Sequence, residues 1–110
     1  MKTDRELLEL AAKAAGYKFD STSPFEIAQE HKAGTDWIEW NPLNDDGDAL
    51  RLAVKLGIGV QSYRYLKYSV ATAEGSMWSV RETVHHEECE TAATRRAITR
   101  AAAAIGEGMK

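Results

Sequence analysis

An alanine-rich stretch at residues 88–105 constrains the fold more strongly than any other part of this sequence. Its apolar side chains recur at helical spacing and form a narrow stripe made of Ala97, Ile98, Ala101, Ala102 and Ile105. Because most of these side chains are small, a helix that carries them can lie close to a sheet. We therefore expect a helix over residues 88–105 and a sheet elsewhere in the chain for it to cover.

Two further stretches carry helix signals. Thr3 and Glu6 match a capping box, and the apolar run after them stops at Gly16, which predicts a helix over residues 4–15. The acids of the motif DDGD precede apolar residues at helical spacing, and Gly57 follows, which predicts a helix over residues 46–56.

The predicted strands lie mainly after the second helix. Residues 60–71 are rich in β-branched and aromatic types and predict one strand. Residues 73–76 predict a turn, and residues 78–84 alternate polar and apolar side chains as a half-buried strand does, which completes a hairpin. A short edge strand is predicted over residues 36–40.

Residues 17–34 carry conflicting signals. The segment from Tyr17 to Phe19 has the composition of a short strand, whereas Ser23, Pro24 and Glu26 resemble the start of a helical turn. We interpret the whole stretch as a loop with room for one helical turn.

Together these elements predict one α+β domain over residues 1–110, with a mainly antiparallel sheet and a central hairpin packed between or against three helices. A chain of 110 residues, 44% of them hydrophobic, can bury a core without a disulfide or a metal. The single cysteine and the lack of a long apolar run predict a cytoplasmic protein with no membrane partner. A net charge of −3 disfavours general nucleic-acid binding.

The motif DDGD raises the question of a metal site. If Gly47 is the sixth position of an EF-hand loop, the first and twelfth positions are a proline and an alanine, which cannot bind calcium through their side chains. Asp45 can instead cap the following helix, while Asp46 and Asp48 place negative charge at its positive end. We interpret the motif as a helix start.

The motif HHEECE contains the candidate ligands or catalytic groups His85, His86 and Cys89. It lacks the paired spacing of a zinc site, and the acids around Cys89 are expected to raise the pKa of its thiol, which argues against a nucleophile. His31, in a polar stretch, is interpreted as a surface residue. We therefore expect no catalytic residue, metal or cofactor and no enzyme; an enzyme or metal protein centred on the HHEECE residues is the least favoured alternative.

Two stretches have the composition of nucleic-acid contacts. The first lies on the predicted last helix and consists of Arg95, Arg96 and Arg100. The second is YRYLKY at residues 63–68, whose interleaved aromatic and basic side chains include Tyr63, Arg64, Tyr65 and Lys67. A solvated helix face and a strand also explain the two stretches, and in an acidic chain we favour that interpretation over nucleic-acid contact.

The tryptophans are candidates for a different kind of contact. Trp37, Trp40 and Trp78 are interpreted as core or rim residues, but a cluster of exposed tryptophans would form a hot spot for a partner. The candidate partner-binding residues are Trp37, Trp40, Asp45, Asp46 and Asp48.

Three blocks of the sequence resemble a known group of proteins. They are LLELAAKAAGY at residues 7–17, WNPLNDDGDALRLAVKLGI at residues 40–58 and TAATRRAITRAAAAIG at residues 91–106. In combination they resemble small proteins encoded by bacteriophages and prophages, including the family described as the phage α/β/α (ABA) sandwich domain. The resemblance implies a phage or prophage origin and helices flanking a sheet, and it implies no catalytic residues.

The leading functional hypothesis follows from the resemblance and from the lack of a catalytic constellation. We expect a non-catalytic phage accessory protein that acts in the cytoplasm of a bacterial host by binding a host or phage protein. Inhibition of a bacterial defence system is one specific form of this hypothesis, in which the acids at residues 44–48 and 87–90 compete for a nucleic-acid site. The alternative is a small nucleic-acid-binding module that uses the three arginines and the 63–68 segment.

Overall fold

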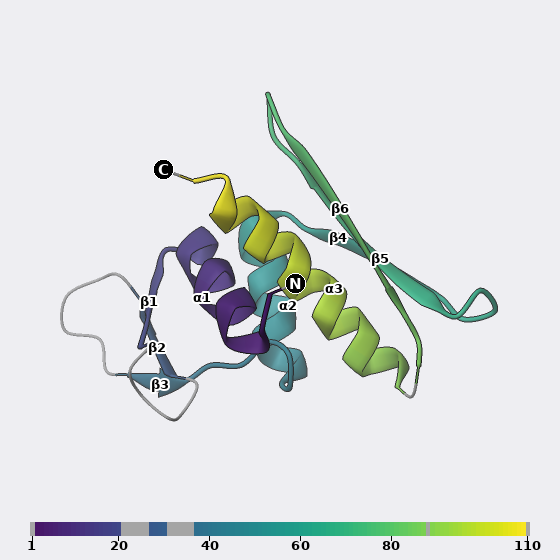
Figure 1. Ribbon diagram of the computed structural model, residues 1–110, viewed down its shortest axis with the longest axis horizontal. Helices are drawn as coiled ribbons and strands as arrows, with labels where there is room; N and C mark the ends of the chain where they lie inside the picture. The colour runs from purple at the N-terminus through teal and green to yellow at the C-terminus, as the bar shows by residue number, and fades with distance from the viewer. Residues whose placement is uncertain (1, 21–26, 31–36, 88, 110) are drawn as a thin grey trace.

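A computed structural model describes residues 2–20, 27–30, 37–87 and 89–109 of the chain (Figure 1). Within these residues there are three helices: α1 (Asp4–Ala15), α2 (Asp46–Leu56) and α3 (Glu90–Glu107). The strands are β1 (Tyr17–Phe19), β2 (Ile27–Glu30), β3 (Ile38–Glu39), β4 (Gly59–Tyr63), β5 (Tyr68–Glu74) and β6 (Ser79–His85). The chain is an α+β protein, as predicted.

All three predicted helices are confirmed, and their ends show why the local signals sufficed. Thr3 and Glu6 form the capping box of α1, and the side chain of Asp45 caps α2 by accepting a hydrogen bond from the backbone N–H of Asp48. Gly16 and Gly57 end these helices in the left-handed conformation, with φ of 79° and 67°. This conformation strains a residue with a side chain, so glycine is favoured at both positions.

The prediction of one strand over residues 60–71 is wrong, because the chain reverses in the middle of it. β4 ends at Tyr63, residues 64–67 form a turn, and β5 begins at Tyr68. Lys67 makes the reversal possible by adopting a φ of 59°. The turn predicted at residues 73–76 exists but lies later than expected, since β5 continues to Glu74 and β6 starts at Ser79.

The stretch interpreted as a loop over residues 17–34 contains two strands instead. β1 and β2 pair antiparallel, and β3 pairs with the other side of β2, so β3 is the edge strand that the sequence predicted. The sequence IAQE of β2 has no strand pattern of its own, and its conformation follows from pairing on both sides. The predicted helical turn at residues 23–26 lies outside the described residues.

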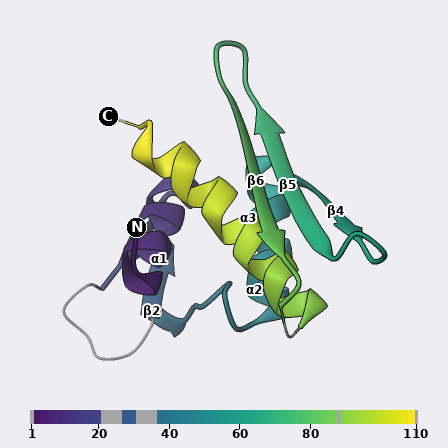
Figure 2. The ribbon, with the colours of Figure 1, turned by 45° about the vertical axis from the view of Figure 1, so that its right-hand side comes forward.

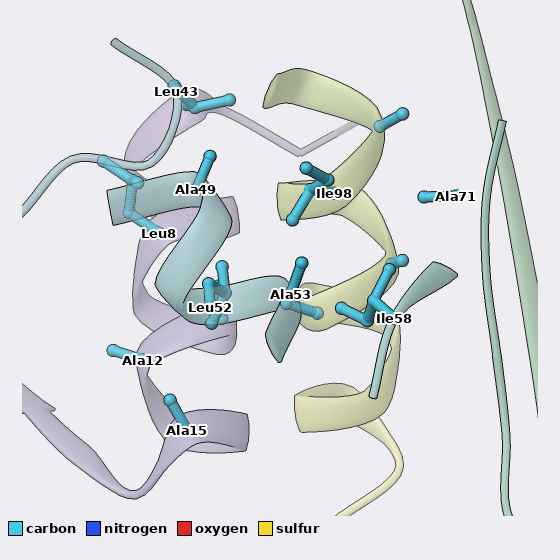
Figure 3. Packing of buried hydrophobic residues seen from close by; sticks show 14 of the residues in the cluster. Leu8, Ala12, Ala15, Leu43, Ala49, Leu52, Ala53, Ile58, Ala71 and Ile98 are labelled. Carbon is cyan, nitrogen blue, oxygen red and sulfur yellow. The ribbon is translucent and has the colours of Figure 1, made fainter. Parts of the chain in front are cut away.

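The helices lie between two three-stranded antiparallel sheets. Figures 1 and 2 show sheet β4–β5–β6 beside α3, with α1 on the far side of α3 and sheet β1–β2–β3 beyond α1. The core between these elements includes Leu8 and Ala12 of α1, Leu52 of α2 and Ile98 of α3 (Figure 3). α3 is therefore the element around which the rest of the chain is assembled.

The small residues of α3 allow close packing against α1 as well as against the sheet. Ala97, Ala101 and Ala102 are fully buried. At Gly106 the two helix backbones approach so closely that a Cβ atom would overlap the carbonyl group of Leu10. An ion pair of 2.9 Å between Lys2, just before α1, and Glu107, the last residue of α3, adds a second contact between these parts of the chain.

Candidate binding surface

The acids of DDGD are engaged in contacts within the chain. Asp48 accepts a hydrogen bond from the backbone N–H of Asn41 at 2.9 Å and pairs with Arg51 at 2.7 Å. Asp45 caps α2, and Asp46 pairs with Arg95 of α3 at 2.6 Å. The structure therefore agrees with the helix-start interpretation, and in the described part of the chain no group of three or more acidic, histidine or cysteine side chains could hold a metal ion.

Two of the three arginines on α3 tie helices together. Besides pairing with Asp46, Arg95 donates from Nε to the carbonyl of Leu43 at 2.9 Å, and its side chain is largely buried. Arg96 pairs with Asp4 at the start of α1, at 3.1 Å. Arg100 has no such partner among the described residues and lines an open hollow between β6 and α3. The three side chains do not form the continuous basic surface that a phosphate backbone needs.

The tryptophans do not gather into one hot spot. Trp40 is buried and makes edge contacts with the rings of Tyr17 and Phe19, at centroid distances of 5.8 and 6.4 Å, so it anchors sheet β1–β2–β3 to the core. Trp37 is exposed at the other end of β3, and Trp78 is exposed at the turn between β5 and β6. Of the five candidate partner-binding residues, Trp37 alone is exposed and has no capping, pairing or core contact with the described part of the chain.

The fold turns His86 away from His85 and Cys89, which both line the open hollow between β6 and α3. His85 ends β6 with its ring 6.2 Å from that of Tyr68, whereas His86 is turned toward Ser69. Cys89 is exposed at the N-terminal end of α3, where the hydroxyl of Thr91, followed by the backbone N–H groups of Ala92 and Thr91, lowers the pKa of its thiol. The prediction of a raised pKa is wrong because these hydrogen-bond donors, together with the charge of Arg95, outweigh the raising effect of desolvation.

Ser69 and His86 resemble a catalytic pair in distance but not in chemistry. Ser69 Oγ lies 2.8 Å from His86 Nε2 and 2.8 Å from the hydroxyl of Thr94, which donates its own proton to the carbonyl of Glu90. When the Thr94 proton points to the Glu90 carbonyl, Ser69 donates to Thr94 and Nε2 of His86 donates to Ser69. In that arrangement the histidine does not accept the serine proton, and Ser69, at 0% exposure, cannot be reached by a substrate. This chain of hydrogen bonds joins β5 to α3.

The contact of Ser69 with Thr94 also defines the two faces of sheet β4–β5–β6. Side chains alternate along a strand, so Ser69, Ala71 and Ala73 face α3 while Tyr68 points to the opposite side, which we call the outer face. The register places Tyr63 and His85 beside Tyr68 on that face. The rings of Tyr63 and Tyr68 are 5.1 Å apart, so three rings form one row across the three strands.

The turn between β4 and β5 continues this row of rings beyond the ends of the two strands. Tyr65 is 96% exposed and Leu66 is exposed beside it, although neither contributes to the core. We call the segment 63–68 together with His85 the hairpin surface. The sequence drew attention to the segment, but the approach of His85 depends on pairing between residues 17 positions apart and could not be read from a local pattern.

The charge around the hairpin surface differs from that of the acidic chain as a whole. Arg64 and Lys67 in the turn, and Arg81 farther along the outer face, have no ion-pair partner among the described residues. Glu82 lies on the side of the sheet that faces the helices, where it lines a hollow with Lys2 and residues of α3. Arg64 and Lys67 thus place positive charge that has no ion-pair partner among the described residues next to the aromatic side chains of the hairpin surface.

Comparisons of the chain with protein-family models, with curated proteins and with solved structures found no match. The fold and the surface define a small α+β protein with three helices and a three-stranded antiparallel sheet packed against α3. No helix in the described part of the chain is long and apolar enough to cross a membrane. His31 lies outside the described residues.

Proposed function

We propose that this protein is a non-catalytic binding protein that contacts a macromolecular partner through the hairpin surface. The observation that carries the proposal is the row of Tyr63, Tyr68 and His85 on the outer face, extended by the exposed Tyr65. Tyrosine and arginine are the residue types most enriched at the energetic centres of interfaces, because they combine a large apolar area with a polar end.

The class of partner that we propose first is a host or phage protein in the bacterial cytoplasm. The three sequence blocks that resemble phage ABA sandwich proteins support this origin, and an accessory role such as inhibition of a defence system is consistent with a chain that binds rather than catalyses. Because Asp45, Asp46 and Asp48 are engaged within the chain, the hairpin surface is a better contact than the acidic residues at 44–48.

Single-stranded nucleic acid is the second candidate partner, and a specific observation favours it. Exposed rings beside unpaired cations are the elements with which proteins stack bases and neutralise phosphates, and Arg64, Lys67 and Arg81 supply those cations. In this form of the hypothesis the 63–68 segment acts without Arg95 and Arg96, whose side chains pair with acids of α2 and α1.

Affinity capture tests the first candidate, a protein partner, with a double variant at the tip of the β4–β5 turn that we call the tip variant. Tagged protein is incubated with bacterial lysate, with and without nuclease, and the bound proteins are identified by mass spectrometry. The expected result is a stoichiometric, nuclease-resistant partner that is lost with Tyr65→Ser/Leu66→Ser. Met77→Ser is the matched control, because Met77 is an exposed apolar residue at the opposite turn of the same sheet. Capture that survives the tip variant, or is lost equally with the control, would contradict the proposal.

Salt dependence tests the second candidate. We expect a labelled single-stranded oligonucleotide to bind with an affinity that falls with salt, and Arg64→Ala/Lys67→Ala to reduce the slope of log affinity against log salt by about 1.4 if both cations contact phosphates. Lys18→Ala, an exposed cation on β1, should leave the slope unchanged. Binding that is absent, or whose slope is the same in all three proteins, argues against nucleic acid.

A further inference from the structure

We propose that the free edge of β4 pairs with β4 of a second copy of this chain, in an antiparallel register centred on Gln61. The two three-stranded sheets would then form one continuous sheet of six strands. This inference concerns the edge of β4, which shares only Tyr63 with the hairpin surface, and it does not depend on the proposed function.

The position of β4 makes its edge available. β4 is an end strand in the order β4–β5–β6, and Figure 2 shows it at the outer side of the sheet, away from the helices. All of its five residues are exposed, and within the described residues its backbone is paired only with β5. Alternate N–H and C=O groups along the other edge of β4 are therefore free to pair with a further strand.

The composition of β4 does not protect this edge. Soluble proteins usually block free edges with charged residues, proline or a bulge, but the sequence GVQSY has no charge and no proline, and its five residues pair with β5 one to one without a bulge. The opposite edge of the sheet is protected, because β6 carries Arg81, Glu82 and His85. Symmetric pairing of β6 about its central residue would place Glu82 directly opposite Glu82 of the other copy, which is destabilising.

The order of side chains in β4 favours a second copy over an unrelated strand. In the register centred on Gln61 all five residues pair: Gln61 lies opposite itself, Val60 opposite Ser62, and Gly59 opposite Tyr63 of the second copy. A Cβ atom built at Gly59 meets only Thr72, at 3.7 Å, so the face above this glycine has room for a tyrosine ring. An aromatic side chain across from a strand glycine covers backbone that would otherwise be exposed.

The same register covers apolar surface without opposing charges. Val60 is 44% exposed in the single chain and would gain a neighbour on the adjacent strand. The paired segments are neutral, so the net charge of −3 on each chain lies away from the contact. Because two five-residue strands bury little area compared with a permanent interface, we expect a dimer that dissociates on dilution.

Replacing Gln61 with a residue of either charge tests both the contact between the two copies and its register. In sedimentation velocity over a range of concentrations, the unmodified chain should show a monomer–dimer equilibrium. Gln61→Lys and Gln61→Glu should each be monomeric, because two like charges would lie directly opposite at the centre. An equimolar mixture of the two variants should form a dimer again, since the opposite charges then face each other.

Val60→Lys and Val60→Glu are the matched controls. Residue 60 lies opposite residue 62 and not opposite itself. Mixing Val60→Lys with Val60→Glu should therefore increase dimer formation less than mixing the two Gln61 variants does. Equal melting temperatures for all four variants show that the single chain remains folded. A chain that stays monomeric at every concentration, or Gln61 variants that each dimerise as the unmodified chain does, would overturn the proposal, and restoration by the Val60 pair alone would overturn the register.

Discussion

At the scale of single residues, Cys89 shows how a helix end can change the chemistry of a side chain. The hydroxyl of Thr91 and the backbone N–H groups of Ala92 and Thr91 stabilise the thiolate, so the pKa of Cys89 is lower in the folded chain than its ordinary value. We expect alkylation by iodoacetamide to reach half its maximal rate at a lower pH in the folded than in the urea-unfolded protein. Thr91→Ala should move the folded midpoint upward, and identical midpoints in the folded and unfolded protein would refute this account.

Asp45 gives a second prediction at this scale, which separates a structural acid from a binding acid. Its carboxylate caps α2, and Asp45→Ala should lower the free energy of unfolding by about 1 kcal/mol. Asp45→Asn retains a capping oxygen and should cost much less, although it removes the charge. Denaturant unfolding measures both values. Equal losses for the two variants would show that charge, and not capping, is the contribution of this residue.

At the scale of elements, the contact between α1 and α3 depends on one glycine. A Cβ atom at position 106 would overlap the carbonyl of Leu10, and backbone atoms of a packed helix cannot move aside as a flexible side chain can. Gly106→Ala should therefore lower the free energy of unfolding by about 1–3 kcal/mol, despite the better helix propensity of alanine. Gly108→Ala is the control, because its Cβ would make only ordinary contacts, the nearest at 3.6 Å. Thermal and denaturant unfolding that rank the two variants equally would contradict the close contact.

At the scale of the whole molecule, the parts that could be predicted from the sequence are those determined by neighbouring residues. Helix caps and glycine stops act within one turn, so α1 and α2 were predicted with their ends. β2 could not be predicted, since its strand conformation comes from pairing with β1 and β3. The reversal at Lys67 was hidden because aromatic and β-branched residues occur on both sides of it.

The candidate site likewise combines features set by neighbouring residues with features set by the tertiary fold. The 63–68 segment was recognised from its composition, but the row with His85 depends on the register of β5 and β6. The ion pair of Arg95 also depends on the tertiary fold, because its partner Asp46 is 49 positions away on another helix. A local pattern can show which side chains are basic, whereas the fold decides which of them remain free.

The central place of α3 has a consequence for the order in which the molecule can be completed. α1 leaves the ribosome before α3, yet the surface that buries its small residues belongs to α3, which ends at residue 107. Until that residue has been synthesised and released, α1 and the sheets have no common layer to pack against. The core therefore closes only after α3 has left the ribosome, and the apolar faces of α1 and α2 stay exposed until then.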